Sequence, residues 1–131
     1  GAGALKQIFT DSGVSMVLAE GIQSWDMHPL ILAWLITAVI RVAVGSATVA
    51  GLTTAGIIAP LVPTLNVDPN LLVLSIGAGS LVFSHFNDGG FWMYKEYFNL
   101  SIKDTLRSWT LMETVVAVAG LGGVLLLDLI L

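Results

Sequence analysis

Residues 83–92 read Phe-Ser-His-Phe-Asn-Asp-Gly-Gly-Phe-Trp, a polar and glycine-rich run within an otherwise apolar part of the chain. A shorter run, Gly-Ser-Ala-Thr at residues 45–48, interrupts the apolar sequence about forty positions earlier. Polar side chains are costly at membrane depth, and backbone that leaves the helix is tolerated there only where protein buries it or water reaches it. Two such breaks therefore indicate a binding site inside a membrane protein.

The composition is that of an integral membrane protein. Hydrophobic residues make up 56% of the chain and charged residues 11%, and the mean hydropathy is +0.90, all far from the values of a soluble domain. The net charge of -4 excludes nucleic acid as a partner and leaves the lipid bilayer as the implied surroundings. The absence of cysteine excludes a disulfide framework and thiol chemistry. Because the chain begins Gly-Ala-Gly-Ala without a methionine or a signal pattern, we expect it to be a piece of a longer protein.

The apolar segment at residues 30–62 predicts a re-entrant helical hairpin. Its roughly 33 residues would form about 50 Å of helix, too long for one span and too short for two spans with a connection. The polar run at residues 45–48 divides it into two arms, each shorter than the hydrocarbon core. We therefore predict a hairpin over residues 28–63 whose tip lies at 45–48, near the membrane midplane.

The segments on either side of this hairpin are also predicted to be helical. Residues 1–27 have the pattern of amphipathic arm helices that lie in the membrane interface, with a surface helix pair as the alternative. Residues 64–99 are expected to form a discontinuous transmembrane helix, broken at 84–90. The fold class is thus all-α and integral to the membrane.

The last segment, residues 100–131, is expected to be a cytoplasmic loop followed by one full transmembrane helix. Lys95, Lys103 and Arg107 are three of the five basic residues, and the positive-inside rule places such a cluster in the cytoplasm. The span itself would begin at Trp109. We interpret the nearby tryptophan and tyrosine side chains, Trp109 included, as an aromatic belt at the membrane surface.

Candidate anion-binding groups lie on the first hairpin arm and at the tip. Arg41 lies too deep to reach the membrane surface, so its guanidinium either holds a substrate carboxylate or forms a buried ion pair, for example with Asp88. After Gly45 a new helix begins, where the hydroxyls of Ser46 and Thr48 and the free amides suit an anion. The alternative for these tip residues is an ordinary helix cap.

The second break carries the candidate proton-coupling groups. Ser84 and Asp88 lie on one helical face, and His85 is near enough in sequence to share a proton with Asp88. The alternative for His85 is that its ring only satisfies a carbonyl group. An ionised Asp88 at a helix start would repel an anionic substrate, whereas a protonated one would not. Asp88 is therefore the leading candidate for a group that takes up a proton together with an anion.

Catalysis, metal binding and cofactor binding have little support in the sequence. No serine, histidine and acid set has the context of a hydrolase, and two histidines without cysteine make no convincing metal site. No glycine-rich phosphate motif follows a strand, so we expect neither ATP-driven transport nor an enzyme.

Together, the two polar runs resemble the gluconate permease family. The resemblance also includes Gly-Ala-Gly-Ala-Leu-Lys at the start, Arg-Val-Ala-Val-Gly-Ser-Ala-Thr at residues 41–48 and Lys-Glu-Tyr-Phe at residues 95–98. It covers essentially the whole chain and corresponds to the C-terminal third of such a protein. One departure is Phe86, where many members have valine, and it would alter the shape of the pocket if its ring faces the site.

This resemblance implies a gluconate:proton symporter of the bacterial inner membrane, within the ion transporter superfamily. Such carriers are typically homodimers, and each inverted repeat contributes a re-entrant hairpin and a broken helix that move as an elevator against a scaffold. The remaining N-terminal part of the transporter would supply the other half of the site. The implied substrate-binding residues are Arg41, Gly45, Ser46, Thr48, Ser84 and Asn87, and the implied proton-coupling residues are Asp88 and His85.

The sequence leaves two alternatives to a proton-coupled carrier. A sodium-coupled organic-acid carrier would use Asn87, Asp88 and the tip carbonyls to hold a cation. A membrane assembly subunit that transports nothing would use the polar runs only to lock helices together.

Overall fold

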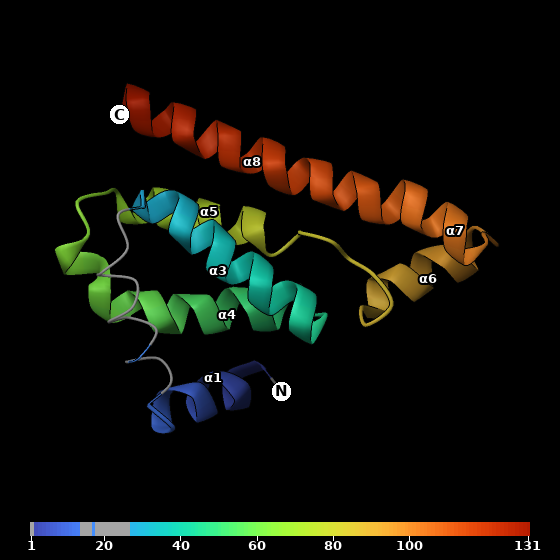
Figure 1. Cartoon of the computed structure of the whole chain (residues 1–131), viewed down its shortest axis with the longest axis horizontal. Coiled ribbons are helices and arrows are strands. Elements are labelled where there is room, and N and C mark those ends of the chain that lie inside the picture. The colour runs from blue at the N-terminus through green and yellow to red at the C-terminus, as the bar shows by residue number, and fades with distance from the viewer. Residues whose placement is uncertain (1, 14–16, 18–26) are drawn as a thin grey trace.

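The computed structural model describes residues 2–13, 17 and 27–131, and every regular element in these ranges is helical. Residues 1, 14–16 and 18–26 of the predicted arm lie outside the described residues. Its described part is helix α1 (Ala2–Asp11), which runs beside α4 (Figure 1). The prediction of an all-α chain is thus confirmed for the part of the chain that the structure describes.

Helices α3 (Pro29–Val44) and α4 (Ala47–Ile58) pack side by side as a helical hairpin (Figure 1). Gly45 ends α3 with a left-handed φ of +80°, and its N–H donates to the carbonyl of Arg41 at 2.8 Å. Ser46 then starts α4, because its Oγ accepts the N–H of Val49 at 3.3 Å. The break at the tip therefore follows from a glycine C-cap and a serine N-cap in succession.

Helix α5 (Pro69–Gly79) follows the short helix η1 (Ala59–Thr64) and packs against both α3 and α8. Asp68 caps α5 by accepting the N–H of Asn70 at 2.9 Å, and Pro69 occupies the first helical position, where its missing N–H costs nothing. The core lies where α3, α4, α5 and α8 meet. Its buried side chains are Leu30, Ala33, Ile57, Ile58, Leu71, Leu72, Ile76 and Val124.

The second break covers residues 80–88, between α5 and helix α6 (Gly89–Tyr97). The chain leaves the helix at Ser80, four residues before the expected position. At its last residue α5 lies directly against α3, where a Cβ on Gly79 would lie 2.6 Å from the carbonyl oxygen of Trp34. The break ends at Asp88, two residues before the expected end at residue 90, because Asp88 caps α6 by accepting the N–H of Gly90 at 3.0 Å.

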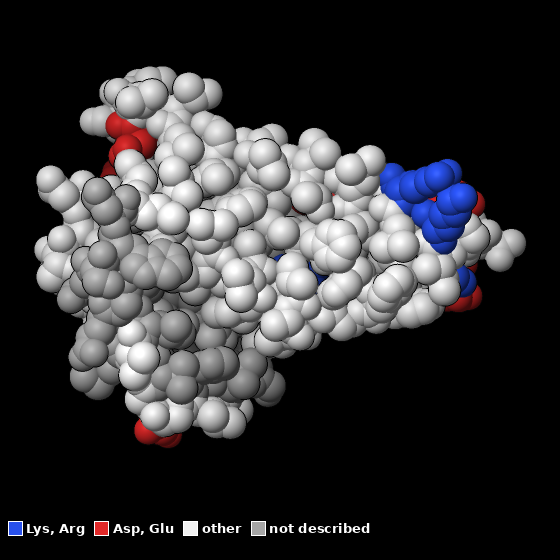
Figure 2. All heavy atoms as spheres, in the orientation of Figure 1, with Lys and Arg blue, Asp and Glu red and all other residues white. Residues whose placement is uncertain are grey.

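The last part of the chain is one continuous helical stretch made of α7 (Ile102–Thr105), the π-helical turn η2 (Leu106–Thr110) and α8 (Leu111–Ile130). Residues 102–108, expected as a loop, are helical because Ser101 caps α7 by accepting the N–H of Asp104 at 3.1 Å. Figure 2 shows the basic side chains gathered at the end of the molecule where α6 and α7 lie. The basic cluster predicted around residues 95–107 is therefore compact in space.

Two stretches among the described residues are long and apolar enough to cross a membrane. They are Ala47–Thr64, with 18 residues, and Ile102–Ile130, with 29 residues. Most apolar side chains of α8 are exposed, and Ala117 and Val124 are its buried ones. The outer surface of α8 is thus suited to lipid or to further protein.

Candidate functional site

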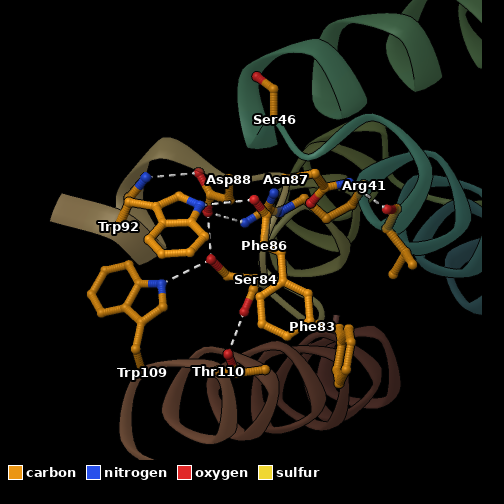
Figure 3. Close-up of polar contacts among 12 residues, drawn as sticks. Arg41, Ser46, Phe83, Ser84, Phe86, Asn87, Asp88, Trp92, Trp109 and Thr110 are labelled. Carbon is orange, nitrogen blue, oxygen red and sulfur yellow. Dashed lines mark hydrogen bonds and ion pairs between the residues drawn. The ribbon is translucent and has the colours of Figure 1, made fainter. Parts of the chain in front are cut away.

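The two helix breaks, predicted separately from sequence, contact each other in the structure. Asn87 Nδ2 donates to the carbonyl oxygen of Val42 at 2.9 Å, which attaches the loop at residues 80–88 to the last turn of α3. A Cβ on Gly45 would lie 2.2 Å from the carbonyl oxygen of Asn87, so only glycine permits this approach. The breaks therefore form one polar region, shown in Figure 3.

A buried ion pair between Arg41 and Asp88 lies at the centre of this region. Arg41 Nη2 donates to Asp88 Oδ2 at 2.6 Å, and the arginine side chain is 2% exposed. Of the two interpretations that the sequence left open for Arg41, this conformation adopts the ion pair. Such a pair joins α3 to the start of α6, two elements that are distant in sequence.

Arg41 nevertheless keeps hydrogen-bonding capacity that the described residues do not use. Its Nε and Nη1 atoms are buried and have no hydrogen-bond partner in the part of the chain that the structure describes. A guanidinium carries five N–H donors, three of them on these two atoms. An unpaired buried donor costs about 1–3 kcal/mol, so this arrangement is costly unless another group completes it.

The Asp88 carboxylate receives donors from three directions. Arg41 and the hydroxyl of Ser84 both donate to Oδ2, and the N–H of Gly90 donates to Oδ1. An ionised carboxylate only accepts hydrogen bonds, and this set of donors matches that state. In this conformation both oxygens of Asp88 accept hydrogen bonds from the protein, and the side chain stays 19% exposed.

Helix α8 and its π-helical start hold the second break from the other side. Trp109 Nε1 donates to Ser84 Oγ at 2.8 Å, and the hydroxyl of Thr110 donates to the carbonyl of Ser84. One turn further, Thr114 Oγ1 accepts the N–H of Phe83 at 3.1 Å. Sequence reasoning missed these contacts and placed Trp109 in an aromatic belt. The available signal was the polar pair Thr110 and Thr114, four residues apart on an otherwise apolar helix.

The remaining predicted site residues have other contacts than the ion pair of Arg41 and Asp88. Ser46 uses its hydroxyl to cap α4, while Thr48 is exposed and borders a groove between α4 and α5. The ring of His85 packs against Phe83 and Phe86, with centroid distances of 5.1 and 6.0 Å. Its Nδ1 is buried and has no partner among the described residues. The structure thus brings Arg41, Ser84, Asn87 and Asp88 together and sets Thr48 apart from them.

Glu113 adds a second carboxylate to the surroundings of the pair. It lies on α8 beside Thr114, it is half-buried, and the charges of both Arg41 and Asp88 act on it. If all three groups are ionised, their charges sum to one negative unit. An anionic ligand would therefore meet net repulsion until at least one carboxylate is neutralised.

Among the described residues, no group of three or more histidine, cysteine, aspartate or glutamate side chains could hold a metal ion.

The helical architecture, the two candidate spans and the buried polar site between helix breaks are the features of a membrane carrier. This is the class of protein that the fold and the site define.

The sequence comparisons give the family. The chain belongs to the GntP family of permeases, whose profile matches residues 1–130. It is 50% identical over 131 residues to a high-affinity gluconate transporter of Escherichia coli (strain K12), covering 100% of this chain and 30% of that protein. It is 51% identical over 130 residues to a gluconate permease of Bacillus subtilis (strain 168), covering 99% of this chain and 29% of that protein.

The name of a further relative refers to L-idonate instead of gluconate. The Gnt-II system L-idonate transporter of Escherichia coli (strain K12) is 47% identical over 131 residues, covering 100% of this chain and 30% of that protein. The chain therefore spans about 30% of the length of these curated relatives. No solved structure matches the chain.

Proposed function

We propose that the protein to which this chain belongs imports gluconate or a related sugar acid across the bacterial inner membrane by proton symport. The family and the names of its relatives support the substrate class. The observation that carries the mechanism is the buried pair of Arg41 and Asp88, in which Asp88 occupies part of a guanidinium that still has unused donors.

Proton uptake and anion binding are coupled in this proposal because both involve the same ion pair. A sugar-acid carboxylate is a planar acceptor that suits the guanidinium fork of Arg41. While Asp88 is ionised it competes for Nη2 and repels the incoming carboxylate. A proton on Asp88 removes both effects, so a proton and an anion enter together and the pair with its substrate gains no net charge.

The other polar groups of the two breaks would bind the rest of the substrate. Ser84 and Asn87 lie beside the pair, and Ser46 with Gly45 lies at the hairpin tip. Thr48 lies apart from these groups, and we propose that it contacts substrate where the N-terminal part of the transporter completes the site. His85, whose Nδ1 has unused hydrogen-bonding capacity, is proposed as a secondary group on the proton path.

The proposed arrangement in the membrane is that of the inverted-repeat carriers that the chain resembles. Residues 28–63 form a re-entrant hairpin and residues 64–99 a discontinuous span, and together with the final span they make up half of an inverted-repeat, elevator-type transporter. Helix α1 is proposed to belong to the interfacial arm, and the basic cluster near α7 is proposed to lie in the cytoplasm. The apolar outer face of α8 supports a membrane location, and we propose a homodimer for the full-length protein.

Sodium coupling fits the observed contacts less well than proton coupling. Asn87 directs its amide group to the carbonyl of Val42 and therefore presents a donor at that point, whereas a cation needs acceptors. Both oxygens of Asp88 already receive N–H or O–H donors. Protonation of Asp88 would also displace one of these donors, but a proton needs no surrounding set of oxygen ligands.

Uptake of labelled gluconate by the full-length protein in proteoliposomes tests the proposal. We expect accumulation with an imposed inward proton gradient and without sodium. Accumulation that follows a sodium gradient and ignores the proton gradient would contradict proton coupling. Absence of gluconate exchange under every gradient would favour the membrane assembly subunit.

A further inference from the structure

The indole of Trp109, in the π-helical turn η2 that precedes α8, forms a hydrogen bond inside the candidate site. Its Nε1 donates to Ser84 Oγ at 2.8 Å, and Ser84 in turn donates to Asp88 Oδ2, the oxygen that also receives Arg41 (Figure 3). A chain of hydrogen bonds thus runs from the last helix to the ion pair.

The direction of this chain is fixed by the chemistry of the indole. An indole N–H can only donate, so Ser84 Oγ must accept from Trp109. The one proton of the serine hydroxyl is then free to point at Asp88, whose ionised oxygen can only accept. Without the indole N–H, the hydroxyl could turn away from Asp88 and donate elsewhere.

The indole ring is itself held in place by packing. It lies against the ring of Tyr94, with centroids 5.1 Å apart, and beside Gly90, where a Cβ would lie 3.5 Å from Trp109 Cζ2. The π-helical turn η2 contains both Trp109 and Thr110, which bind the hydroxyl and the carbonyl of the same residue, Ser84. Such turns are rare in helices and are frequently found at functional sites.

We infer that Trp109 is a positioning residue for proton coupling: it directs the hydroxyl of Ser84 to Asp88 and so favours the ionised, Arg41-bound form of that carboxylate. This inference rests on the proposed function and adds a residue outside the proposed binding set. Arg41 from α3, Glu113 from α8 and His85 from the loop are the other charged or titratable groups near Asp88, and none of them contacts Ser84 Oγ through an observed hydrogen bond among the described residues.

The test measures gluconate affinity against pH for purified full-length protein. Trp109→Phe keeps an aromatic ring and removes the N–H, and benzothienylalanine at position 109 removes the N–H while keeping the ring size. We expect the pH at which affinity is half-maximal to rise by about 0.5 to 1 unit in both variants, a three- to tenfold change in proton affinity. Trp34→Phe is the matched control, because Trp34 also uses its indole N–H in a hydrogen bond, but to the carbonyl of Ala117 on α8 at 3.0 Å rather than to Ser84.

A double substitution separates positioning from general support of the fold. In a Ser84→Ala background, Trp109→Phe should produce no further shift, because the hydroxyl through which it acts is gone. A pH profile equal to that of wild type in both Trp109 variants would overturn the inference, as would a shift that persists in the Ser84→Ala background. A wild-type affinity that does not vary with pH would instead contradict the proposed proton coupling itself.

Discussion

Replacing Asp88 with asparagine should abolish the pH dependence of gluconate binding. If three donors hold the carboxylate ionised and the anion needs it protonated, wild-type affinity falls tenfold for each pH unit above the midpoint. Between about pH 6 and about pH 8 the wild-type dissociation constant then rises about 100-fold. In the Asp88→Asn variant it should change by less than about twofold, because asparagine does not titrate.

The same substitution should lower stability in the absence of substrate. An asparagine amide has one oxygen and one NH₂ group, whereas both oxygens of Asp88 accept hydrogen bonds. Either orientation of the amide therefore sets an NH₂ group against an existing donor. Losing one charge-assisted hydrogen bond costs about 1.5–3 kcal/mol, and bound gluconate should restore part of it through Arg41.

Calorimetric titration of the full-length protein with gluconate, repeated across the pH range, gives the affinities, and thermal unfolding gives the stabilities. Asp128→Asn is the matched control, because Asp128 is a carboxylate on α8 that binds His28 Nε2 at 3.0 Å, far along the helix from the site. This control should keep the wild-type pH dependence. An Asp88→Asn variant with a wild-type pH profile would refute the assignment of the coupling proton to Asp88.

Three further substitutions test other parts of the site. Arg41→Lys should weaken gluconate binding by about tenfold or more, measured by titration, because an ammonium group cannot hold a carboxylate with two parallel hydrogen bonds. Gly45→Ala should destabilise the protein by about 1–3 kcal/mol in thermal unfolding, because of its positive φ and the 2.2 Å approach to Asn87, whereas Gly122→Ala, with open space around it, should not. Glu113→Gln should tighten gluconate binding by about two- to fivefold, since it removes a negative charge that acts on the pair.

Each of these substitutions has an outcome that would count against the account. Unchanged affinity in Arg41→Lys would place the carboxylate elsewhere. Equal stability of the Gly45 and Gly122 variants would mean that the contact between the two breaks is not tight. Weaker binding in Glu113→Gln would indicate that Glu113 binds the substrate rather than repels it.

Local chemistry made the helix ends predictable from sequence. Gly45 and Ser46 form a C-cap and an N-cap in succession, and Asp88 begins a helix next to two glycines, so the tip and the end of the second break could be located without tertiary information. Asp68 with Pro69 marked the start of α5 in the same way. These signals lie within a few residues of the feature that they determine.

Features that depend on contacts between distant segments could not be predicted in this way. The second break begins at Ser80, next to the point where α5 meets the backbone of Trp34, and no local pattern encodes that approach. The sequence left Arg41 open between a substrate and Asp88, because the choice depends on how α3 meets the loop. Trp109 is interpreted from sequence as an interfacial tryptophan, because the local sequence does not distinguish an indole at the membrane surface from one that donates to a buried serine.

The central claim is that a proton and a sugar-acid anion bind together at the pair formed by Arg41 and Asp88. Proton uptake on gluconate binding tests it most directly, by titration of the full-length protein in buffers of different ionisation enthalpy near neutral pH. We expect uptake of about one proton per gluconate in the wild type and none in Asp88→Asn. Binding without proton uptake in the wild type, or equal uptake in the two proteins, would contradict it.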